Sequence, residues 1–271
     1  MKSKGTFVTM SGAGNTFAVF QAVGHEGDLP APESRRAFVA PLCRNLAVDG
    51  VLFIEAGRDQ ADYTWDFYNA DGSSAEMCGN AARCAGLFCR EVIRDPRPSY
   101  RFLTGAGPVT VEGLADGRWR VEMTEIKNPP AQKTLRLLDK DHQGFAVNTG
   151  VPHFVIPVEN LGDLPASVCR ALRQHPEWGP AGSNITLLQK ESATRARAKT
   201  YERGVEDFTA ACGTGAVAAA LVLQNEHGRQ GPVLIRMPGG DLEVDTASPA
   251  PRLTGPARIT KEHPLTEETF Q

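Results

Sequence analysis

The sequence lacks the features that mark several large classes of protein. No apolar run approaches the roughly 20 residues that a membrane helix needs, and the start of the chain does not read as a secretory signal. Basic residues (29) and acidic residues (32) nearly balance, giving a net charge of -3. The chain therefore lacks the excess of positive charge that is typical of proteins that bind nucleic acid or an anionic membrane. We expect a soluble, cytoplasmic protein whose partner is a small molecule, with a homodimer as an open alternative to a monomer.

Cysteine is also scarce, with six in 271 residues. This is too few for a disulfide scaffold in a chain long enough to build its own core. The chain has no Cys-x-x-Cys pair and its histidines are scattered, so we expect no metal site. The Gly105-Ala106-Gly107 run leads into Pro108 instead of a helix, which argues against a dinucleotide site. We expect no cofactor.

The composition, 41% hydrophobic and 23% charged, is that of a globular protein with one large domain or two small ones. Short β-rich runs alternate with helix-like stretches, which predicts a mixed α/β fold. Strands are predicted at residues 6–9, 17–23, 51–55, 63–68, 109–114, 119–123, 145–149, 154–158, 184–189 and 196–202. Helices are predicted at residues 33–45, 81–93, 164–174 and 213–223.

The pattern breaks at Asn128-Pro129-Pro130, and the polar stretch 132–143 after it predicts a linker or an interdomain hairpin. We place the domain boundary there. The predicted domains are residues 1–127, with the C-terminal segment 256–271 as an open addition, and residues 128–255.

Two short segments indicate an internal repeat. Residues 78–82 (CGNAA) and 212–216 (CGTGA) each open an Ala-rich helix, and each follows a strand by the same interval. Asn69 and Arg203 lie nine positions before the two cysteines, so we expect them to be counterparts. Duplication accounts for these matches better than coincidence does.

A helix that begins directly after Cys-Gly can bind an anion, because its first N–H groups are unpaired and its dipole is positive there. The same field favours a thiolate over a thiol. If the two halves face each other, one carboxylate could receive both helix ends, with a sulfur on each side of its α-carbon. Such a site suits inversion of an amino acid by one base and one acid.

The motifs together resemble those of diaminopimelate epimerase. The matching runs are residues 69–73 (NADGS), 76–80 (EMCGN), 201–204 (YERG) and 211–215 (ACGTG), with weaker matches at 10–15 and 150–153. The resemblance covers the whole chain, in the right order. It implies two pseudo-symmetric domains, each a curled mixed sheet around a central helix, with the active site in the interdomain cleft.

The resemblance also implies roles for particular residues. Cys78 and Cys212 match the two acid/base cysteines, and His153 and Glu202 match residues that bias the protonation of the sulfurs. Arg203 suits a distal carboxylate, because guanidinium binds it through two parallel hydrogen bonds. The residues that match substrate contacts are Asn15, Asn69, Gly79, Asn80, Asn184, Glu202, Arg203, Gly213 and Thr214.

The sequence departs from the family pattern around the substrate. Gly50 stands where the family often has Gln, Val151 replaces an Asn, and Phe208 replaces a Glu. Ser11 and Thr16 stand where a His and an Asp are common. The leading substrate is LL-diaminopimelate, converted to the meso form. Three alternatives stay open: a racemase of another amino acid such as histidine, a catalytically silent amino-acid-binding protein, and a thiol redox protein.

Overall fold

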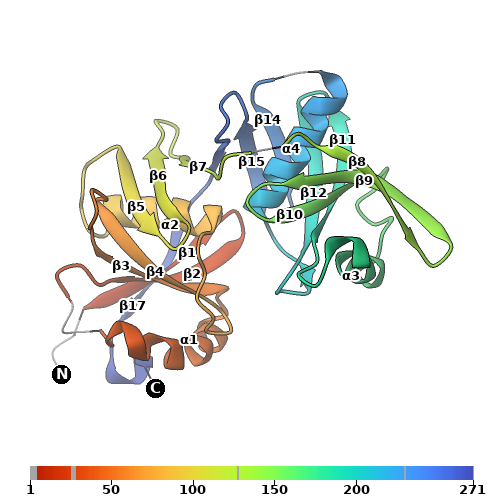
Figure 1. The fold of residues 1–271 in the computed structure, drawn as a ribbon. Coiled ribbons are helices and arrows are strands. Elements are labelled where there is room, and N and C mark those ends of the chain that lie inside the picture. Colours follow the sequence, from red (N-terminus) through yellow and green to blue (C-terminus); the bar gives the residue numbers. More distant parts are fainter. Residues whose placement is uncertain (1–4, 26–28, 127, 229, 271) are drawn as a thin grey trace. The chain divides into compact units, whose positions relative to one another are not determined.

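The computed structural model describes residues 5–25, 29–126, 128–228 and 230–270. The chain divides into an N-terminal unit, residues 1–121 with 255–271, and a C-terminal unit, residues 122–254. Each unit combines one sheet with two α-helices, so the predicted α/β class is confirmed (Figure 1). The helices are α1 (Pro32–Leu46), α2 (Gly79–Glu91), α3 (Ala166–Arg173) and α4 (Gly213–His227), with two short 3-10 helices, η1 (Pro176–Trp178) and η2 (Glu267–Phe270).

The sheet of the N-terminal unit has the order β17-β1-β2-β3-β4-β5-β6-β7. Its β2–β3 and β4–β5 neighbours are parallel, and the other pairs are antiparallel. The chain therefore returns at its C-terminal end to pair with β1. The strands are β1 (Thr6–Gly12), β2 (Asn15–Gln21), β3 (Gly50–Ala56), β4 (Tyr63–Asn69), β5 (Ser99–Thr104), β6 (Gly107–Gly113), β7 (Trp119–Glu122) and β17 (Arg258–Pro264).

The sheet of the C-terminal unit has the order β8-β9-β10-β11-β12-β14-β15-β16, and the short β13 also pairs with β12. Here β10–β11 and β12–β14 are the parallel pairs. Parallel and antiparallel neighbours thus follow the same order in both units, which supports the internal repeat. The strands are β8 (Ala131–Leu137), β9 (Lys140–Asn148), β10 (Pro152–Pro157), β11 (Asn184–Ser192), β12 (Arg195–Glu202), β13 (Asp207–Phe208), β14 (Val233–Met237), β15 (Gly240–Asp245) and β16 (Arg252–Gly255).

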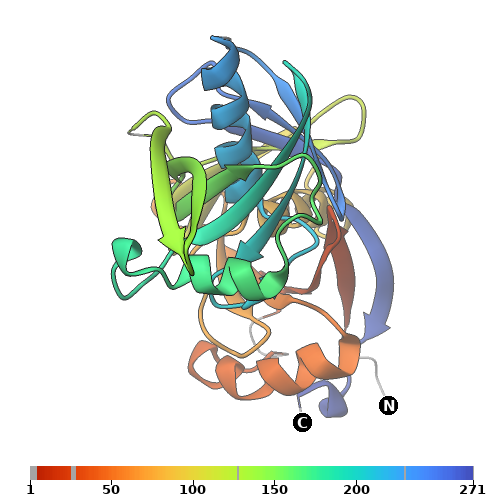
Figure 2. The same cartoon turned by 90° about the vertical axis from the view of Figure 1, so that its right-hand side faces the viewer.

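One helix in each unit is surrounded by its own sheet. Helix α2 packs against β1, β2, β3, β6 and β17, strands from distant parts of the sheet order, so the sheet curls around it. Helix α4 packs in the same way against β9 to β12, β14 and β15 (Figure 2). Small side chains permit this close packing: a Cβ on Gly86 would meet the Trp119 ring at 2.6 Å. These buried helices are the ones that begin after Cys78 and Cys212.

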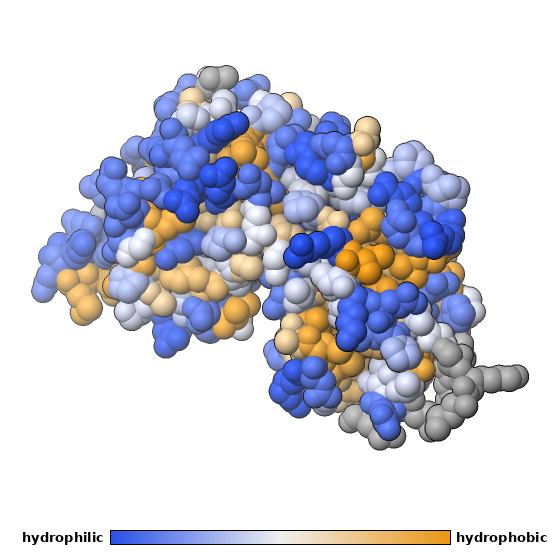
Figure 3. Space-filling model, turned by 180° about the vertical axis from the view of Figure 1, so that it is seen from behind, coloured by the Kyte–Doolittle hydropathy of each residue, from blue (hydrophilic) through white to orange (hydrophobic). Residues whose placement is uncertain are grey.

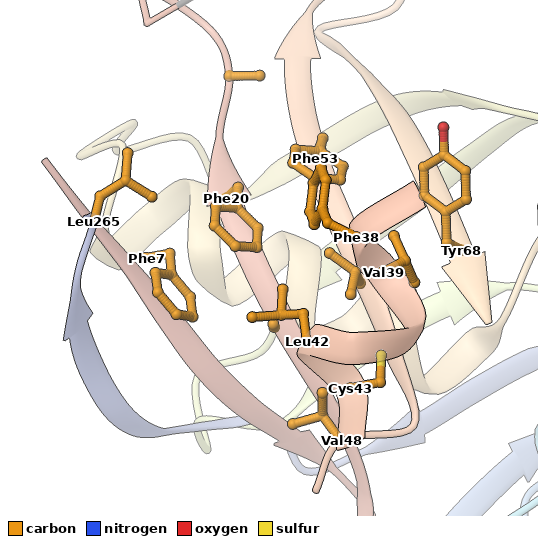
Figure 4. Packing of buried hydrophobic residues seen from close by; sticks show 13 residues of the cluster. Phe7, Phe20, Phe38, Val39, Leu42, Cys43, Val48, Phe53, Tyr68 and Leu265 are labelled. Atoms are coloured by element: carbon orange, nitrogen blue, oxygen red, sulfur yellow. The ribbon is translucent and has the colours of Figure 1, made fainter. Parts of the chain in front are cut away.

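The other helix of each unit covers the outside of the sheet. Helix α1 packs Phe38 and Leu42 onto Phe20 and Phe53 (Figure 4). Helix α3 packs Leu172 in the same way against strands of the C-terminal unit. Each large apolar side chain that is fully buried contributes about 1.5–3 kcal/mol. The buried helices are thereby held between well-packed layers.

The surface offers few large apolar groups. Figure 3 shows hydrophilic residues over much of one face, with smaller hydrophobic areas between them. The polar stretch 132–143 forms most of the β8–β9 hairpin, so it is not a linker. Leu138 in its turn is 89% exposed. Among the described residues, no helix is long and apolar enough to cross a membrane.

Candidate active site

In the N-terminal unit, α2 begins directly after Cys78. This residue is the N-cap, in an extended conformation with φ -144° and ψ 123°, and its side chain does not cap the helix. The first helical bond runs from the Ala82 N–H to the Cys78 carbonyl oxygen. Gly79 and Asn80 therefore lie in the first turn, where N–H groups point along the axis and the dipole is positive. The half-buried Cys78 lies at this helix end, which is suited to bind an anion.

The Asn80 side chain lies between Asn15 and Arg83. It donates to Asn15 Oδ1 and accepts from Arg83 Nη2 at 2.6 Å. Asn15 Nδ2 donates in turn to Asp49 Oδ2 at 3.4 Å. Arg83 also donates to the Gly79 carbonyl oxygen at 3.3 Å. The structure thus joins two predicted substrate contacts, Asn15 and Asn80, at the start of α2.

Asn69 ends β4 in the same sheet. Gly50 pairs with Phe17 on one side and with Asn69 on the other, which places Asn69 across β3 from the strand that carries Asn15. The Asn69 side chain donates to Ser73 Oγ at 3.0 Å. The Asn69 side chain therefore stabilises the turn between Asn69 and Ser73.

The register of the two sheets identifies the counterpart of Asn69. Tyr68 and Tyr201 match, because each pairs with the second residue of its neighbouring strand, β3 or β11. The counterpart of Asn69 is therefore Glu202. The expected match to Arg203 is wrong by one residue, because the loop before the second cysteine is one residue longer.

In the C-terminal unit, Cys212 caps α4 and is buried, with 5% of its surface exposed. Its Sγ accepts from the Gly215 N–H at 3.4 Å and lies 3.4 Å from Thr214 Oγ1. Burial raises the pKa of the Cys212 thiol well above its usual range, and the Glu202 carboxylate raises it further. Glu202 itself accepts a hydrogen bond from Thr209. Cys212 is therefore a thiol at neutral pH.

The His153 ring links Thr214 to the interior of the sheet. Its Nε2 lies 3.0 Å from Thr214 Oγ1 and 3.4 Å from Asn184 Nδ2. Its Nδ1 lies 3.0 Å from Thr186 Oγ1. The Thr214 hydroxyl lies in turn beside Cys212 Sγ. The structure therefore connects three predicted site residues, His153, Asn184 and Thr214, to the second cysteine.

The charge state of His153 limits what it can do. Burial, and then the positive charge of Arg203, lowers the pKa of His153 to about 3. The ring is therefore neutral at physiological pH. It can exchange hydrogen bonds with the Thr214 hydroxyl, and it cannot stabilise a thiolate as a cation.

Arg203 lies in the exposed turn that follows β12. Its backbone N–H donates to Asn184 Oδ1 at 2.8 Å. The same turn is tied to α3, because Glu206 accepts from Arg173 Nε at 2.9 Å and from the Gly204 N–H at 3.2 Å. Within the part of the chain that the structure describes, no carboxylate pairs with the Arg203 guanidinium. This cation is held by its backbone and is open to an anionic ligand.

Gly50, which replaces a Gln common in the family, leaves no space for a larger group. A Cβ there would meet the Tyr68 carbonyl oxygen at 2.7 Å and the Phe67 ring at 2.9 Å. The neighbouring strand and ring occupy the volume that a side chain at this position would need.

Phe208, which replaces a Glu, packs on Tyr201 with ring centroids 5.6 Å apart. The Lys199 ammonium lies 3.9 Å from the centre of its ring. Val151 is half-buried in the turn before β10. Both replacements put an apolar group in place of a polar one.

Several residues that hold the site were not predicted from the sequence. Arg83 and Thr186 are fully buried partners of Asn80 and His153. Asp49, the residue just before β3, accepts a hydrogen bond from Asn15. An arginine inside an otherwise apolar helix was a usable signal for Arg83. Nothing in the local sequence marks a strand threonine such as Thr186.

Among the described residues, no three His, Cys, Asp or Glu side chains are grouped so that they could hold a metal ion. The N-terminal unit instead gathers a thiol at a helix end with two amides, and the C-terminal unit gathers a thiol at a helix end with an amide, an open guanidinium and a neutral imidazole. This set can bind carboxylates and move protons.

Solved structures of low sequence identity share this fold. A phenazine biosynthesis protein of the PhzF family from Enterococcus faecalis has a TM-score of 0.72 at 12% identity, covering 95% of this chain and 97% of that one. A hydroxyproline epimerase from Agrobacterium vitis has a TM-score of 0.63 at 18% identity, covering 96% and 92%. At these identities the likeness shows the fold alone.

The chain belongs to the diaminopimelate epimerase family. The family model for diaminopimelate epimerase matches residues 7–128 and 145–260. Diaminopimelate epimerase from Aquifex aeolicus is 37% identical over 227 residues, 80% of each chain. Diaminopimelate epimerase from Methanothrix thermoacetophila is 35% identical to this chain over 276 residues, which is 98% of this chain and 97% of that one. The resemblance read from the sequence motifs is thus confirmed.

Proposed function

We propose that the protein is a cofactor-independent, two-base epimerase that inverts the α-carbon of LL-diaminopimelate to give the meso isomer, a precursor of lysine and peptidoglycan. One observation carries this proposal: Cys78 and Cys212 each occupy the N-cap position of a buried helix, in two units whose strands pair in the same order. Membership of the diaminopimelate epimerase family names the substrate class.

The reaction exchanges one proton for another at the α-carbon. A thiolate takes the α-proton and becomes a thiol, while the other thiol donates its proton to the opposite face and becomes a thiolate. No oxidant or reductant is needed. The protonated state of Cys212 makes it the donor in one direction, and the roles exchange in the reverse direction. The reaction requires both sulfur atoms to reach the same α-carbon.

The charge that develops on the reacting carboxylate needs fixed donors, because an α-proton is very weakly acidic. We assign this role to the first N–H groups of the two buried helices, those of Gly79, Asn80, Gly213 and Thr214. Glu202 keeps Cys212 protonated, and His153 acts on the sulfur through the Thr214 hydroxyl.

The distal end of the substrate carries a second carboxylate and an ammonium group. We assign the carboxylate to Arg203, whose guanidinium is exposed and can bind it through two hydrogen bonds. The other proposed substrate contacts are Asn15, Asn69, Asn184 and Glu202.

A panel of amino acids tests the substrate. We expect the purified protein to interconvert LL- and meso-diaminopimelate under reducing conditions, and to leave histidine unchanged. Turnover of histidine without turnover of diaminopimelate would show that the protein is a histidine racemase instead.

Single substitutions test the two-base scheme. Cys78→Ala and Cys212→Ala should each abolish epimerisation and retain the thermal unfolding midpoint of the wild type within a few degrees. Turnover at the wild-type rate in either variant would contradict the scheme.

Two other tests separate the alternative functions. A silent binding protein would bind diaminopimelate without exchanging its α-hydrogen for solvent deuterium. A thiol redox protein would show no isomerase activity after full reduction, the condition in which an epimerase should be most active.

The cytoplasmic location and the homodimer stay predictions. All six cysteines are free thiols in the structure, which agrees with a reducing compartment. Sedimentation of the purified protein measures its assembly state directly.

A further inference from the structure

Four side chains of the N-terminal unit form a hydrogen-bonded row with opposite charges at its ends. Arg83 Nη2 donates to Asn80 Oδ1 at 2.6 Å, and Asn80 Nδ2 donates to Asn15 Oδ1. Asn15 Nδ2 donates to Asp49 Oδ2 at 3.4 Å. A guanidinium can only donate and a carboxylate can only accept, so the two ends have opposite hydrogen-bonding character.

Both ends of the row are fixed. Arg83 is fully buried and also donates to the carbonyl oxygens of Gly79 and Pro256, each at 3.3 Å. Burial lowers the pKa of Arg83 to about 10, which leaves it charged at neutral pH. Asp49 Oδ2 accepts from the Thr16 N–H at 2.8 Å. The acceptors that the described residues provide for Arg83 are uncharged. Burying a charge in such surroundings is costly, which points to a role beyond packing.

The charged ends set the direction of the two amides between them. The oxygen and nitrogen of an Asn amide have nearly the same shape, so their partners decide the orientation. Rotating both amides would turn the Asn80 nitrogen towards a guanidinium and the Asn15 oxygen towards a carboxylate. Two charge-assisted hydrogen bonds would be replaced by repulsive contacts. The half-buried Asn15 retains one further amide hydrogen in the observed orientation.

We infer that Arg83 and Asp49 are positioning residues, which hold the Asn80 and Asn15 amides in one orientation so that Asn15 presents an N–H to a carboxylate of the substrate. This inference rests on the proposed epimerase function. In the reversed orientation Asn15 would present a carbonyl oxygen, which repels a carboxylate.

The backbone makes room for this contact. A Cβ on Gly12 would meet the Asn80 carbonyl oxygen at 2.6 Å, so only glycine lets the end of β1 come this close to α2. In the C-terminal unit the positions that match Asn80 and Arg83 are Thr214 and Val217. The row of amides is thus a feature of the N-terminal unit.

Steady-state kinetics with diaminopimelate test the inference. The wild type is assayed first, because an inactive wild type refutes the proposed function and does not address the positioning residues. With an active wild type, we expect Arg83→Gln to raise KM about tenfold or more, because Gln can donate or accept and no longer fixes the amides. The kcat should change much less than KM. Arg83→Lys, which keeps a charged donor, should restore most of the affinity.

A second buried arginine provides the matched control. Arg35 is 4% exposed and is paired with Glu55 and Asp66, away from the row. Arg35→Gln should lower the thermal unfolding midpoint and leave KM unchanged. If Arg83→Gln does not fold, Asp49→Ala decides, because Asp49 is exposed and its removal should still raise KM. An unchanged KM for diaminopimelate in a folded Arg83→Gln or Asp49→Ala variant would overturn the inference. A KM for Arg83→Lys that is as high as that for Arg83→Gln would overturn it as well.

Discussion

The buried His153 ring makes stability depend on pH in a way that can be calculated. Its pKa is about 3 in the folded protein, against 6.5 for an ordinary histidine, because burial and then Arg203 disfavour the charged ring. Between these values the unfolded chain binds a proton that the folded protein does not. The stability that the neutral His153 contributes to the folded protein is therefore fully present above pH 6.5. It is lost as the pH falls from 6.5 towards 3.

The size of the effect follows from the proton difference. One proton bound only by the unfolded state changes the free energy of unfolding by about 1.4 kcal/mol per pH unit. From pH 7.5 to pH 5.0, the His153 term therefore lowers the free energy of unfolding by about 2 kcal/mol. This is a large share of the about 5–15 kcal/mol that stabilises a typical domain.

Urea unfolding of the wild type and of His153→Gln, at pH 7.5 and pH 5.0, measures this term. The variant loses bonds to Thr186 and Thr214 and should be less stable at pH 7.5. Its further loss on acidification should be smaller than that of the wild type by about 2 kcal/mol. The dependence of the unfolding free energy on urea should be the same for both proteins. Equal losses on acidification would refute a neutral, buried His153.

Two further substitutions test the surroundings of the site. Gly50→Gln should lower the free energy of unfolding by about 1–3 kcal/mol, because its Cβ would meet the Tyr68 carbonyl oxygen at 2.7 Å. An unchanged thermal unfolding midpoint would show that the strands can part there. Glu206→Gln should weaken the tie to Arg173 and raise KM for diaminopimelate several-fold with kcat nearly unchanged, because Arg203 loses its fixed turn. An unchanged KM would show that the ion pair does not position Arg203.

The parts of the fold that could be predicted from the sequence are those with strong local patterns. Strands such as β3 and β4 combine β-branched and aromatic residues, and both are found near the predicted positions. The two buried helices were found because their Cys-Gly starts repeat. Helix α2 begins two residues before the predicted start, because Gly79 is an unusual first residue for a helix.

Other elements could not be predicted because their residues carry no local signal. The side chains of β17 are almost all exposed, so the strand shows no alternation of apolar and polar residues. Its pairing with β1 joins segments about 250 positions apart, which no local pattern reveals.

The site was predicted in part. The cysteines and their helix ends could be read from the repeat, and Arg203 and Glu202 from the family motif. The partners that orient them, such as Arg83 and Thr186, become visible only when strands and helix come together. The burial that gives His153 and Cys212 their protonation states is likewise a property of the folded sheet.

The most direct test of the central claim is the fate of the α-hydrogen in deuterium oxide. LL-diaminopimelate is incubated with the protein, stopped at low conversion, and analysed by mass spectrometry of the separated isomers. Two thiols acting on opposite faces predict deuterium at the inverted carbon of the meso product, and protium in the recovered LL isomer. A product without deuterium, or equal labelling of the recovered LL isomer and the product, would contradict a mechanism with one proton carrier on each face.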